Sequence, residues 1–186
     1  MLKISSCHDK AVVAVKFSSC GKYVATASAD KKACIFDFNQ SVNPIQTLID
    51  HTQGLNCCAW IGTRFLVTGS DDKLVKVWDI ETGKCISSLP GHKSFVYSLN
   101  IHPTTDSVVS GGYDGSIFIS DVRSRFASAV IESHSKPVTS INFHPSGREY
   151  LTSSLDGFVR LWDFSFNSSN HCPCIASLYE SKLTPV

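Results

Sequence analysis

The sequence lacks an excess of charge of either sign. Seventeen Lys and Arg side chains stand against 16 Asp and Glu side chains, so the formal net charge is +1. This balance provides no broad electrostatic attraction to nucleic acid or to an anionic membrane. The sequence also has no apolar run long enough to cross a bilayer and no hydrophobic signal-peptide stretch near Met1. We therefore expect a nuclear or cytoplasmic protein that does not bind nucleic acid or membranes directly.

Closely spaced metal ligands are also scarce. The one compact group is His171-Cys172-Pro173-Cys174, and no second pair of ligands accompanies it. A structural zinc site needs four ligands with a characteristic spacing, so we expect a solvated loop here, with no metal and no cofactor. The eight cysteines do not indicate disulfides, because nothing else in the sequence resembles a secreted protein.

A convincing helical pattern is absent, and a repeat is present instead. The residues from Ser70 to Asp79 read as the end of a strand, a tight turn and a second strand that closes on Trp-Asp. Similar stretches occupy residues 28–37, 112–121 and 154–163. The aspartates that mark the turn are Asp30, Asp72, Asp114 and Asp156, and the closing aspartates are Asp37, Asp79, Asp121 and Asp163. Every gap in both series is 42 residues, which indicates one structural unit copied four times.

Each unit has the same order of elements. The opening histidines are His8, His51, His92 and His134. First strands are expected at Val12–Phe17, Leu55–Trp60, Val96–Ile101 and Val138–Phe143. Second strands are expected at Tyr23–Ser28, Phe65–Ser70, Ser107–Gly112 and Glu149–Ser154, and the turn aspartate leads into a third strand and a weaker fourth. Four short strands per unit, apolar on both faces, predict an all-β chain in which the units stack radially as propeller blades.

The expected blades cover approximately residues 8–50, 51–91, 92–133 and 134–180, and residues 181–186 read as the start of a fifth repeat. We thus expect residues 1–186 to form a single incomplete propeller. An open arc exposes an apolar face and a strand edge at each end. The chain is expected to be a fragment of a longer protein; the alternative is a half-ring that needs a partner or self-association.

Two sets of positions differ between the units while their surroundings repeat. The residue before each turn aspartate is Ala29, Asp71, Tyr113 or Leu155, and the residue five after each histidine is Val13, Asn56, Tyr97 or Thr139. In a propeller both sets surround one mouth of the central channel. Differentiated side chains on a repeated scaffold are suited to specific binding, and Asp71, Tyr97 and Tyr113 together suit an arginine. The alternative is that these are unconstrained loop positions.

The combination His…Ser-x-Asp…Trp-Asp at these offsets resembles the WD40 repeat from residue 8 to about residue 180. The resemblance implies a β-propeller of WD40 repeats, four blades of a seven-bladed ring, and a His–Ser–Asp–Trp hydrogen-bond tetrad within a blade. Two tetrads match in full: His51, Ser70, Asp72 and Trp78, and His134, Ser154, Asp156 and Trp162. The first unit has Phe36 in place of the indole, and the third has Gly112 and Ser120.

A hydrolase also combines Ser, His and Asp, so catalysis is an alternative interpretation. That chemistry needs one exposed nucleophile beside a donor-lined pocket. Here the same trio recurs in several units, and no Gly-x-Ser-x-Gly elbow accompanies it. We expect the trio to be structural, with its buried polar groups satisfying one another, and the protein not to be an enzyme.

Several phrases resemble the WD-repeat core subunits of SET-domain histone H3 lysine-4 methyltransferase complexes of the COMPASS or MLL type. They are Ser28-Ala-Asp-Lys31, Ser70-Asp-Asp-Lys73, Gly83-Lys-Cys85 and His134-Ser-Lys-Pro-Val138. This resemblance implies a non-catalytic scaffold in the nucleus, with the histone H3 tail, the methyltransferase and associated subunits as partners. It places an arginine at the channel mouth, against Ala29, Asn56, Asp71, Tyr97, Tyr113, Thr139 and Leu155. The alternative is a WD40 scaffold in another assembly, such as a ubiquitin-ligase substrate receptor, a splicing factor or a centriolar protein.

Overall fold

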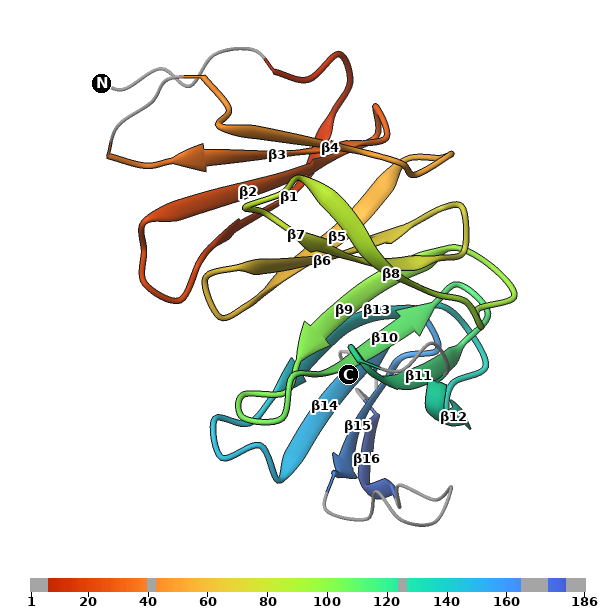
Figure 1. Ribbon diagram of the computed structural model, residues 1–186. Coiled ribbons are helices and arrows are strands. Elements are labelled where there is room, and N and C mark those ends of the chain that lie inside the picture. Colours follow the sequence, from red (N-terminus) through yellow and green to blue (C-terminus); the bar gives the residue numbers. More distant parts are fainter. Residues whose placement is uncertain (1–6, 40–42, 124–126, 165–173, 180–186) are drawn as a thin grey trace, which may run out of the picture.

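The computed structural model describes residues 7–39, 43–123, 127–164 and 174–179. These residues form sixteen strands and no helix, in four antiparallel sheets of four strands each. Within every sheet the strands follow one another in chain order. We call the sheets blades 1 to 4. The predicted all-β architecture of propeller blades is therefore confirmed, and Figure 1 shows the blades succeeding one another from blade 1 at the top to blade 4 at the bottom.

The strand bounds repeat from blade to blade. Blade 1 contains β1 (Val12–Phe17), β2 (Tyr23–Ser28), β3 (Lys32–Asp37) and β4 (Gln46–Ile49). Blade 2 contains β5 (Leu55–Ile61), β6 (Phe65–Ser70), β7 (Val75–Asp79) and β8 (Lys84–Leu89). Blade 3 contains β9 (Val96–Ile101), β10 (Ser107–Gly112), β11 (Ser116–Asp121) and β12 (Ala127–Glu132). Blade 4 contains β13 (Val138–Phe143), β14 (Glu149–Ser154), β15 (Phe158–Asp163) and β16 (Cys174–Tyr179).

The hydrophobic core lies between the blades. One cluster joins Ile35 and Leu48 of blade 1 to Leu66 and Trp78 of blade 2. Equivalent clusters join blade 2 to blade 3 and blade 3 to blade 4. A sheet that packs on both faces needs apolar side chains on both, and all five residues of β7 are buried. The mainly apolar second and third strands of this chain therefore form the middle of stacked blades.

The first strand of each blade lies on the inside of the arc. Strand β5 packs beside β1 on one side and β9 on the other, and β13 packs beside β9. Figure 1 shows two of these strands, β9 and β13, side by side. Burial follows the number of neighbours: five of the six residues of β1 are exposed, because β1 has an adjoining blade on one side, whereas β5 is largely buried.

Two sequence predictions fall outside the described part of the chain. The residues 171–173 of the cysteine and histidine group and the start of a fifth repeat at 181–186 belong to the segments that are not described. Cys174 is described and is exposed at the beginning of β16. Among the described residues there is no helix of the length and apolarity that spanning a membrane requires.

Candidate functional site

The same position in every innermost strand forms a β-bulge. The pairing of the first and second strands skips one residue in each blade, and the skipped residues are Val13, Asn56, Tyr97 and Thr139. These are the residues that lie five after each opening histidine. A bulge leaves one residue outside the regular ladder and re-aims its side chain, and bulges are frequent beside binding sites. The four variable positions of the innermost strands are therefore structurally equivalent.

The second variable set lies directly beside these bulges. In each blade the residue before the turn aspartate donates its backbone amide to the carbonyl that precedes the innermost strand. The four donor–acceptor pairs are Ala29 to Ala11 (3.0 Å), Asp71 to Gly54 (2.9 Å), Tyr113 to Phe95 (2.8 Å) and Leu155 to Pro137 (3.1 Å). Both sets thus occupy one rim of the arc, and we call this surface the channel rim.

The rim contains two direct side-chain contacts between predicted site residues. The Asn56 amide donates from Nδ2 to Oδ1 of Asp71 at 2.7 Å and to the Val96 carbonyl of blade 3 at 3.0 Å. The rings of Tyr97 and Tyr113 lie 6.2 Å apart between centroids, at a tilt of 37°. Tyr97 is 45% exposed and Tyr113 is 52% exposed, so the two phenol rings are available to a partner.

The other predicted rim residues are not joined to this group by any contact in the described residues. Thr139 donates its hydroxyl to the carbonyl of Ser153 at 3.2 Å. Leu155 is 63% exposed and Val13 is 52% exposed. A Cβ on Gly54 would lie 3.3 Å from the Cα of Ala29, so the backbones of blades 1 and 2 approach closely here, and Ala29 itself offers no polar side chain. The rim thus concentrates its recognition chemistry in blades 2 and 3.

A threonine supplies the central hydroxyl of each complete tetrad. In blade 2 the Thr68 hydroxyl lies 2.8 Å from Nε2 of His51, and the indole Nε1 of Trp78 donates to it at 2.8 Å. The prediction that Ser70 has this place is wrong. Ser70 is the last residue of β6, where its hydroxyl donates to the Gly54 carbonyl at 2.8 Å and accepts from the amide of Asp72.

Blade 4 repeats both arrangements. The Thr152 hydroxyl lies 2.8 Å from Nε2 of His134 and accepts from Trp162 at 2.9 Å. Ser154 donates instead to the Lys136 carbonyl at 3.0 Å, so its predicted place in the tetrad is also wrong. A periodic signal for the correct residue does exist in the sequence, because hydroxyl side chains recur every 42 residues at Thr26, Thr68, Ser110 and Thr152.

The blade 2 tetrad satisfies all its polar atoms with one set of proton positions. Neutral His51 donates from Nδ1 to Oδ2 of Asp72 at 2.7 Å and accepts at Nε2 from Thr68, whose oxygen accepts from the indole. Burial lowers the pKa of His51, and the bond to Asp72 offsets this only in part. Burial acts to raise the pKa of Asp72, but the bonds from His51 and two backbone amides outweigh it and hold that pKa below its usual value. The tetrad therefore joins the turn that contains Asp72 to strands β6 and β7.

The tetrads of blades 1 and 3 are incomplete in different ways. In blade 1, His8 contacts Asp30 at 2.9 Å and Thr26 at 2.7 Å, but Phe36 has no indole to donate. In blade 3, Nε2 of His92 lies 2.9 Å from the Ser110 hydroxyl, while its Nδ1 makes no hydrogen bond and is 3.5 Å from Asp114.

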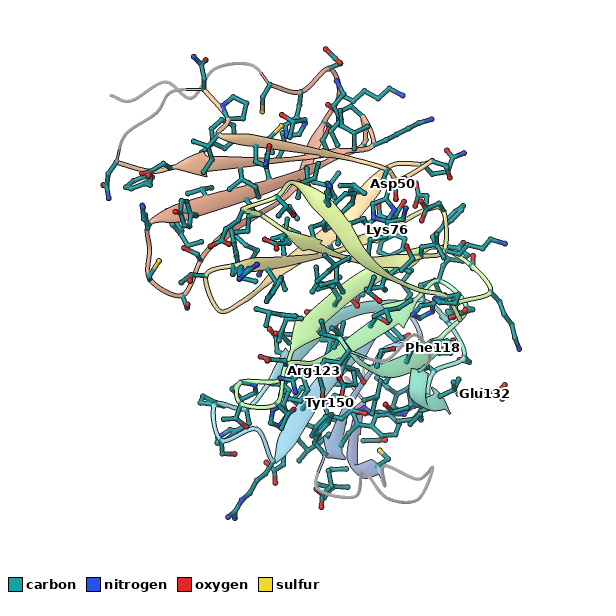
Figure 2. The ribbon with its side chains drawn as sticks, in the orientation of Figure 1. Asp50, Lys76, Phe118, Arg123, Glu132 and Tyr150 are labelled. Atoms are coloured by element: carbon teal, nitrogen blue, oxygen red, sulfur yellow. The ribbon has the colours of Figure 1, made fainter. Side chains whose placement is uncertain are left out.

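One position of the third strand also differs between blades, where the repeat places Cys34, Lys76, Phe118 and Arg160. The ring of Phe118 contacts His92 with 4.2 Å between ring centroids and a tilt of 51°, and Lys76 occupies the equivalent position of blade 2. Lys76 is 6% exposed, and its ammonium donates to the carbonyl of Asp50 at 3.0 Å and to its carboxylate. Figure 2 labels Lys76, Asp50 and Phe118. The lone lysine within an apolar strand is thus a paired structural residue.

One group of potential metal ligands occurs in the described residues. Ligand atoms of Cys7, His8 and Cys34 lie within 4.8 Å of one another. Both nitrogens of His8 already bond to Asp30 and Thr26, so the imidazole is committed to the blade 1 network. Burial raises the pKa of the Cys34 thiol to about 12, which disfavours the thiolate that a metal needs. These observations favour a structural role for all three side chains.

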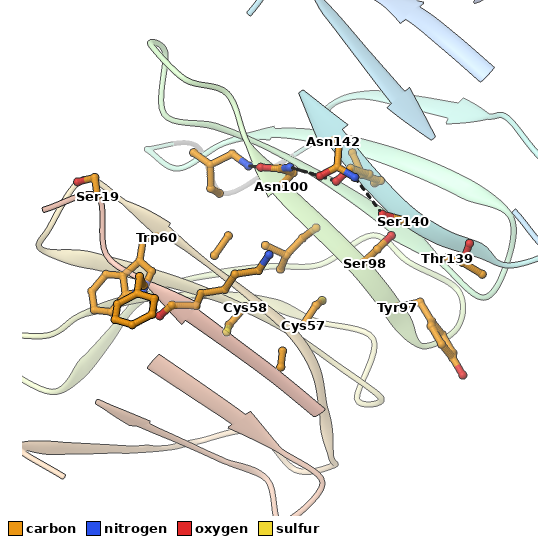
Figure 3. A pocket seen from close by; sticks show the side chains of 17 residues that line it. Ser19, Cys57, Cys58, Trp60, Tyr97, Ser98, Asn100, Thr139, Ser140 and Asn142 are labelled. Atoms are coloured by element: carbon orange, nitrogen blue, oxygen red, sulfur yellow. Dashed lines mark hydrogen bonds between the residues drawn. The ribbon is translucent and has the colours of Figure 1, made fainter. Parts of the chain in front are cut away.

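A groove of about 440 Å³ runs along the inside of the arc below the rim. It is lined by the innermost strands of all four blades, and Tyr97 and Thr139 belong both to the groove and to the rim. Figure 3 shows Tyr97, Thr139 and two asparagines on one side of the groove and Trp60, Cys57 and Cys58 on the other. The rim and the groove thus form one continuous surface.

Comparison with known proteins agrees with this repeat structure. The sequence model of the WD40 family (WD domain, G-beta repeat) matches residues 1–37, 42–79, 83–121 and 127–163. The p21-activated protein kinase-interacting protein 1-like of Gallus gallus is 33% identical over 105 residues, which are 56% of this chain and 28% of that protein. Coatomer subunit beta'-1 of Arabidopsis thaliana is 39% identical over 82 residues, which are 42% of this chain and 9% of that protein. The matched part is therefore less than a third of either relative. Each matched segment of the family ends on a closing aspartate of the 42-residue repeat, and the chain belongs to the WD40 repeat family.

Proposed function

We propose that this protein is a non-catalytic WD40 scaffold whose channel rim binds an arginine-containing peptide. WD40 repeats generally serve as protein-interaction scaffolds, and differentiated side chains on such a scaffold are where binding specificity resides. The observation that carries the proposal is that Asn56 bonds both to the carboxylate of Asp71 and to the Val96 carbonyl of the adjoining blade. Val96 directly precedes Tyr97, whose exposed ring lies beside that of Tyr113.

The chemistry of this group suits a guanidinium. Asn56 donates to Oδ1 of Asp71 and so orients the carboxylate, and no described Lys, Arg or His side chain pairs with it. A guanidinium can therefore donate to the carboxylate while its planar face stacks on a tyrosine ring. The hydrogen bond from Asn56 to the Val96 carbonyl fixes blade 2 against blade 3 beside Tyr97, so the two kinds of contact are held in register.

In its specific form, the proposal names the N-terminal tail of histone H3 and a SET-domain methyltransferase complex, with the protein in the nucleus. The phrases around Asp30, Asp72 and His134 that resemble core subunits of histone H3 lysine-4 methyltransferase complexes support it. In those subunits the mouth of the channel holds an arginine between aromatic side chains, and Tyr97 stands at one of these positions.

The experiment measures binding of a labelled H3 N-terminal peptide by fluorescence anisotropy. Asp71→Asn and Tyr97→Ala are each expected to weaken binding about tenfold, because a charge-assisted bond or an aromatic anchor is lost. Asp106→Asn is the matched control, because it removes an exposed carboxylate from the β9–β10 loop at the other end of blade 3. Equal binding by Asp71→Asn, Tyr97→Ala and the unsubstituted chain would disprove the site.

A second candidate function keeps the same fold and changes the assembly. The names of the two relatives refer to a kinase-interacting protein and to a coatomer subunit, so a scaffold in a kinase or coat assembly is the alternative. Affinity purification followed by mass spectrometry separates the two. Recovery of SET-domain subunits supports the chromatin assignment, whereas recovery of kinases, coat subunits or ubiquitin-ligase adaptors supports the other class of scaffold.

A further inference from the structure

The groove below the rim has a distinct charge. Among its lining residues there is one cationic side chain, Lys16 of β1, and no carboxylate. No described Asp or Glu forms an ion pair with Lys16, whereas Lys22, Lys32 and Lys76 each have an acidic partner. The groove therefore presents an uncompensated positive charge, in contrast to the carboxylate on the rim.

The positive charge of Lys16 influences the two cysteine thiols of strand β5. Burial raises the pKa of the Cys58 thiol to about 12, and the positive charge of Lys16 opposes that rise. The same charge acts on the neighbouring thiol of Cys57. Both cysteines line the groove together with Lys16, so the lysine charge belongs to the same surface as the two thiols.

Lys16 shares one level of the groove with two amide side chains. Each of the three pairs with the second strand of its own blade, and the partners are equivalent residues of the repeat. The pairs are Lys16 with Ala25, Asn100 with Val109 and Asn142 with Leu151. At this level Asn100 donates from Nδ2 to the Ile141 carbonyl at 3.1 Å, and Asn142 donates to the Ser140 hydroxyl at 3.1 Å. Asn142 is exposed, so its amide has room for a further partner.

The depth of this level follows from strand geometry. Lys16 is three residues beyond the bulge at Val13, and Asn100 and Asn142 are three residues beyond Tyr97 and Thr139. At about 3.3 Å per residue, the level lies roughly 10 Å below the rim. An extended peptide covers that distance with about three residues, so one ligand segment can reach both levels.

We infer that the groove binds the carboxylate of an acidic residue in the same peptide whose arginine occupies the rim. This inference rests on the proposed binding of an arginine-containing peptide at the rim, not on the histone H3 form of that proposal, and it adds a second requirement on the ligand. The ammonium of Lys16 donates to the carboxylate, and the Asn142 amide donates beside it. The ligand is thus an extended segment in which a basic and an acidic residue are about three positions apart.

The test uses four capped peptides that differ in two side chains. One contains Arg and Glu three positions apart, the second has Gln in place of Glu, the third has Ala in place of Arg, and the fourth has both changes. Acetylated and amidated ends remove the terminal charges. Each peptide is titrated against the unsubstituted chain and against the variants Lys16→Met and Lys84→Met. The peptide set is made twice, once with the Arg position before the Glu position and once after it. Lys84 is an exposed lysine on the outermost strand β8, so its substitution removes the same charge far from the groove.

The expected result is about fivefold tighter binding of the Arg and Glu peptide than of its Gln counterpart. This gain disappears in Lys16→Met and persists in Lys84→Met. The peptide that has Glu without Arg is expected to bind weakly, again in a Lys16-dependent way. If the Glu and Gln peptides bind equally in every variant, the acidic site is overturned, whatever happens at the rim. If binding depends on Lys16 and on the Glu of the peptide but is unchanged when Ala replaces its Arg, the groove site stands and the proposed arginine site fails.

Discussion

Thr68 and Trp78 are joined by a hydrogen bond of 2.8 Å from the indole nitrogen to the threonine hydroxyl, and the same hydroxyl lies 2.8 Å from His51. Thr68→Val keeps the shape of the side chain and removes both bonds. Two buried polar groups then lack a partner, so we expect unfolding free energy to fall by about 2–4 kcal/mol. Urea denaturation followed by tryptophan fluorescence measures the change.

Ser70→Ala is the comparison for this prediction. Its hydroxyl bonds to the Gly54 carbonyl, which also accepts from the amide of Asp71, and to the amide of Asp72. Removing it is expected to cost about 1 kcal/mol. A larger loss in Ser70→Ala than in Thr68→Val would show that the serine is the structurally important hydroxyl.

The blades and their strands were predictable because the turn residues and the apolar stretches recur together every 42 residues. The exchange of Ser70 for Thr68 shows where such reasoning ends. Both hydroxyls lie on the same face of β6, two residues apart, and the resemblance selected Ser70, although only the position of Thr68 carries a hydroxyl in all four repeats. The folded structure decides this, because His51 lies beside Thr68 in the body of β6, whereas Ser70 at its end bonds to the backbone around the turn.

The channel rim was likewise predictable only in part. The variable positions were visible by comparison of the units, but the bulges that make them equivalent depend on how the first strand pairs with the second. The contact of Asn56 with the carbonyl of Val96 was not predictable, because it crosses from one blade to the next. The positive groove below was also missed, since Lys16 and Asn142 belong to blades 1 and 4 and line one groove only in the folded arc.

Lys73 has a backbone conformation that favours glycine. Its φ is 72°, and the equivalent residue of blade 4 is Gly157, with φ 87°. A side chain in this left-handed region costs about 1–2 kcal/mol, and Lys73 is exposed without an acidic partner in the described residues. We therefore expect Lys73→Gly to stabilise the chain by about 1 kcal/mol, measured as a higher urea midpoint. A lower midpoint would show that this lysine makes a stabilising contact.

Two glycines with a similar positive φ, Gly115 and Gly21, allow the cost of backbone strain to be measured apart from the cost of a steric collision. Their φ values are 78° and 71°, but a Cβ on Gly115 would lie 2.2 Å from the His134 carbonyl oxygen, whereas a Cβ on Gly21 meets nothing within 4 Å. Gly21→Ala is expected to cost about 1 kcal/mol, and Gly115→Ala at least about 3 kcal/mol, because blade 4 must move. Comparable costs for the two substitutions would contradict the close packing of the blade 3 turn against the start of blade 4.

The buried histidines should make stability depend on pH in the mildly acidic range. Burial lowers the pKa of His51, His92 and His134, so the unfolded chain binds protons more readily than the folded chain below about pH 6.5. The free energy of unfolding is then fully present above about pH 6.5 and falls as the pH decreases toward the lowered values. The tetrad aspartates, whose pKa is also lowered, add a second loss of stability below about pH 3.8.

Urea unfolding at intervals between pH 8 and pH 4 tests the dependence on the histidines, with His144→Gln as a control that removes an exposed imidazole outside the tetrads. The control is expected to have the same slope as the unsubstituted chain, and stability that stays level from pH 7 to pH 5 would contradict neutral, buried histidines in the blades.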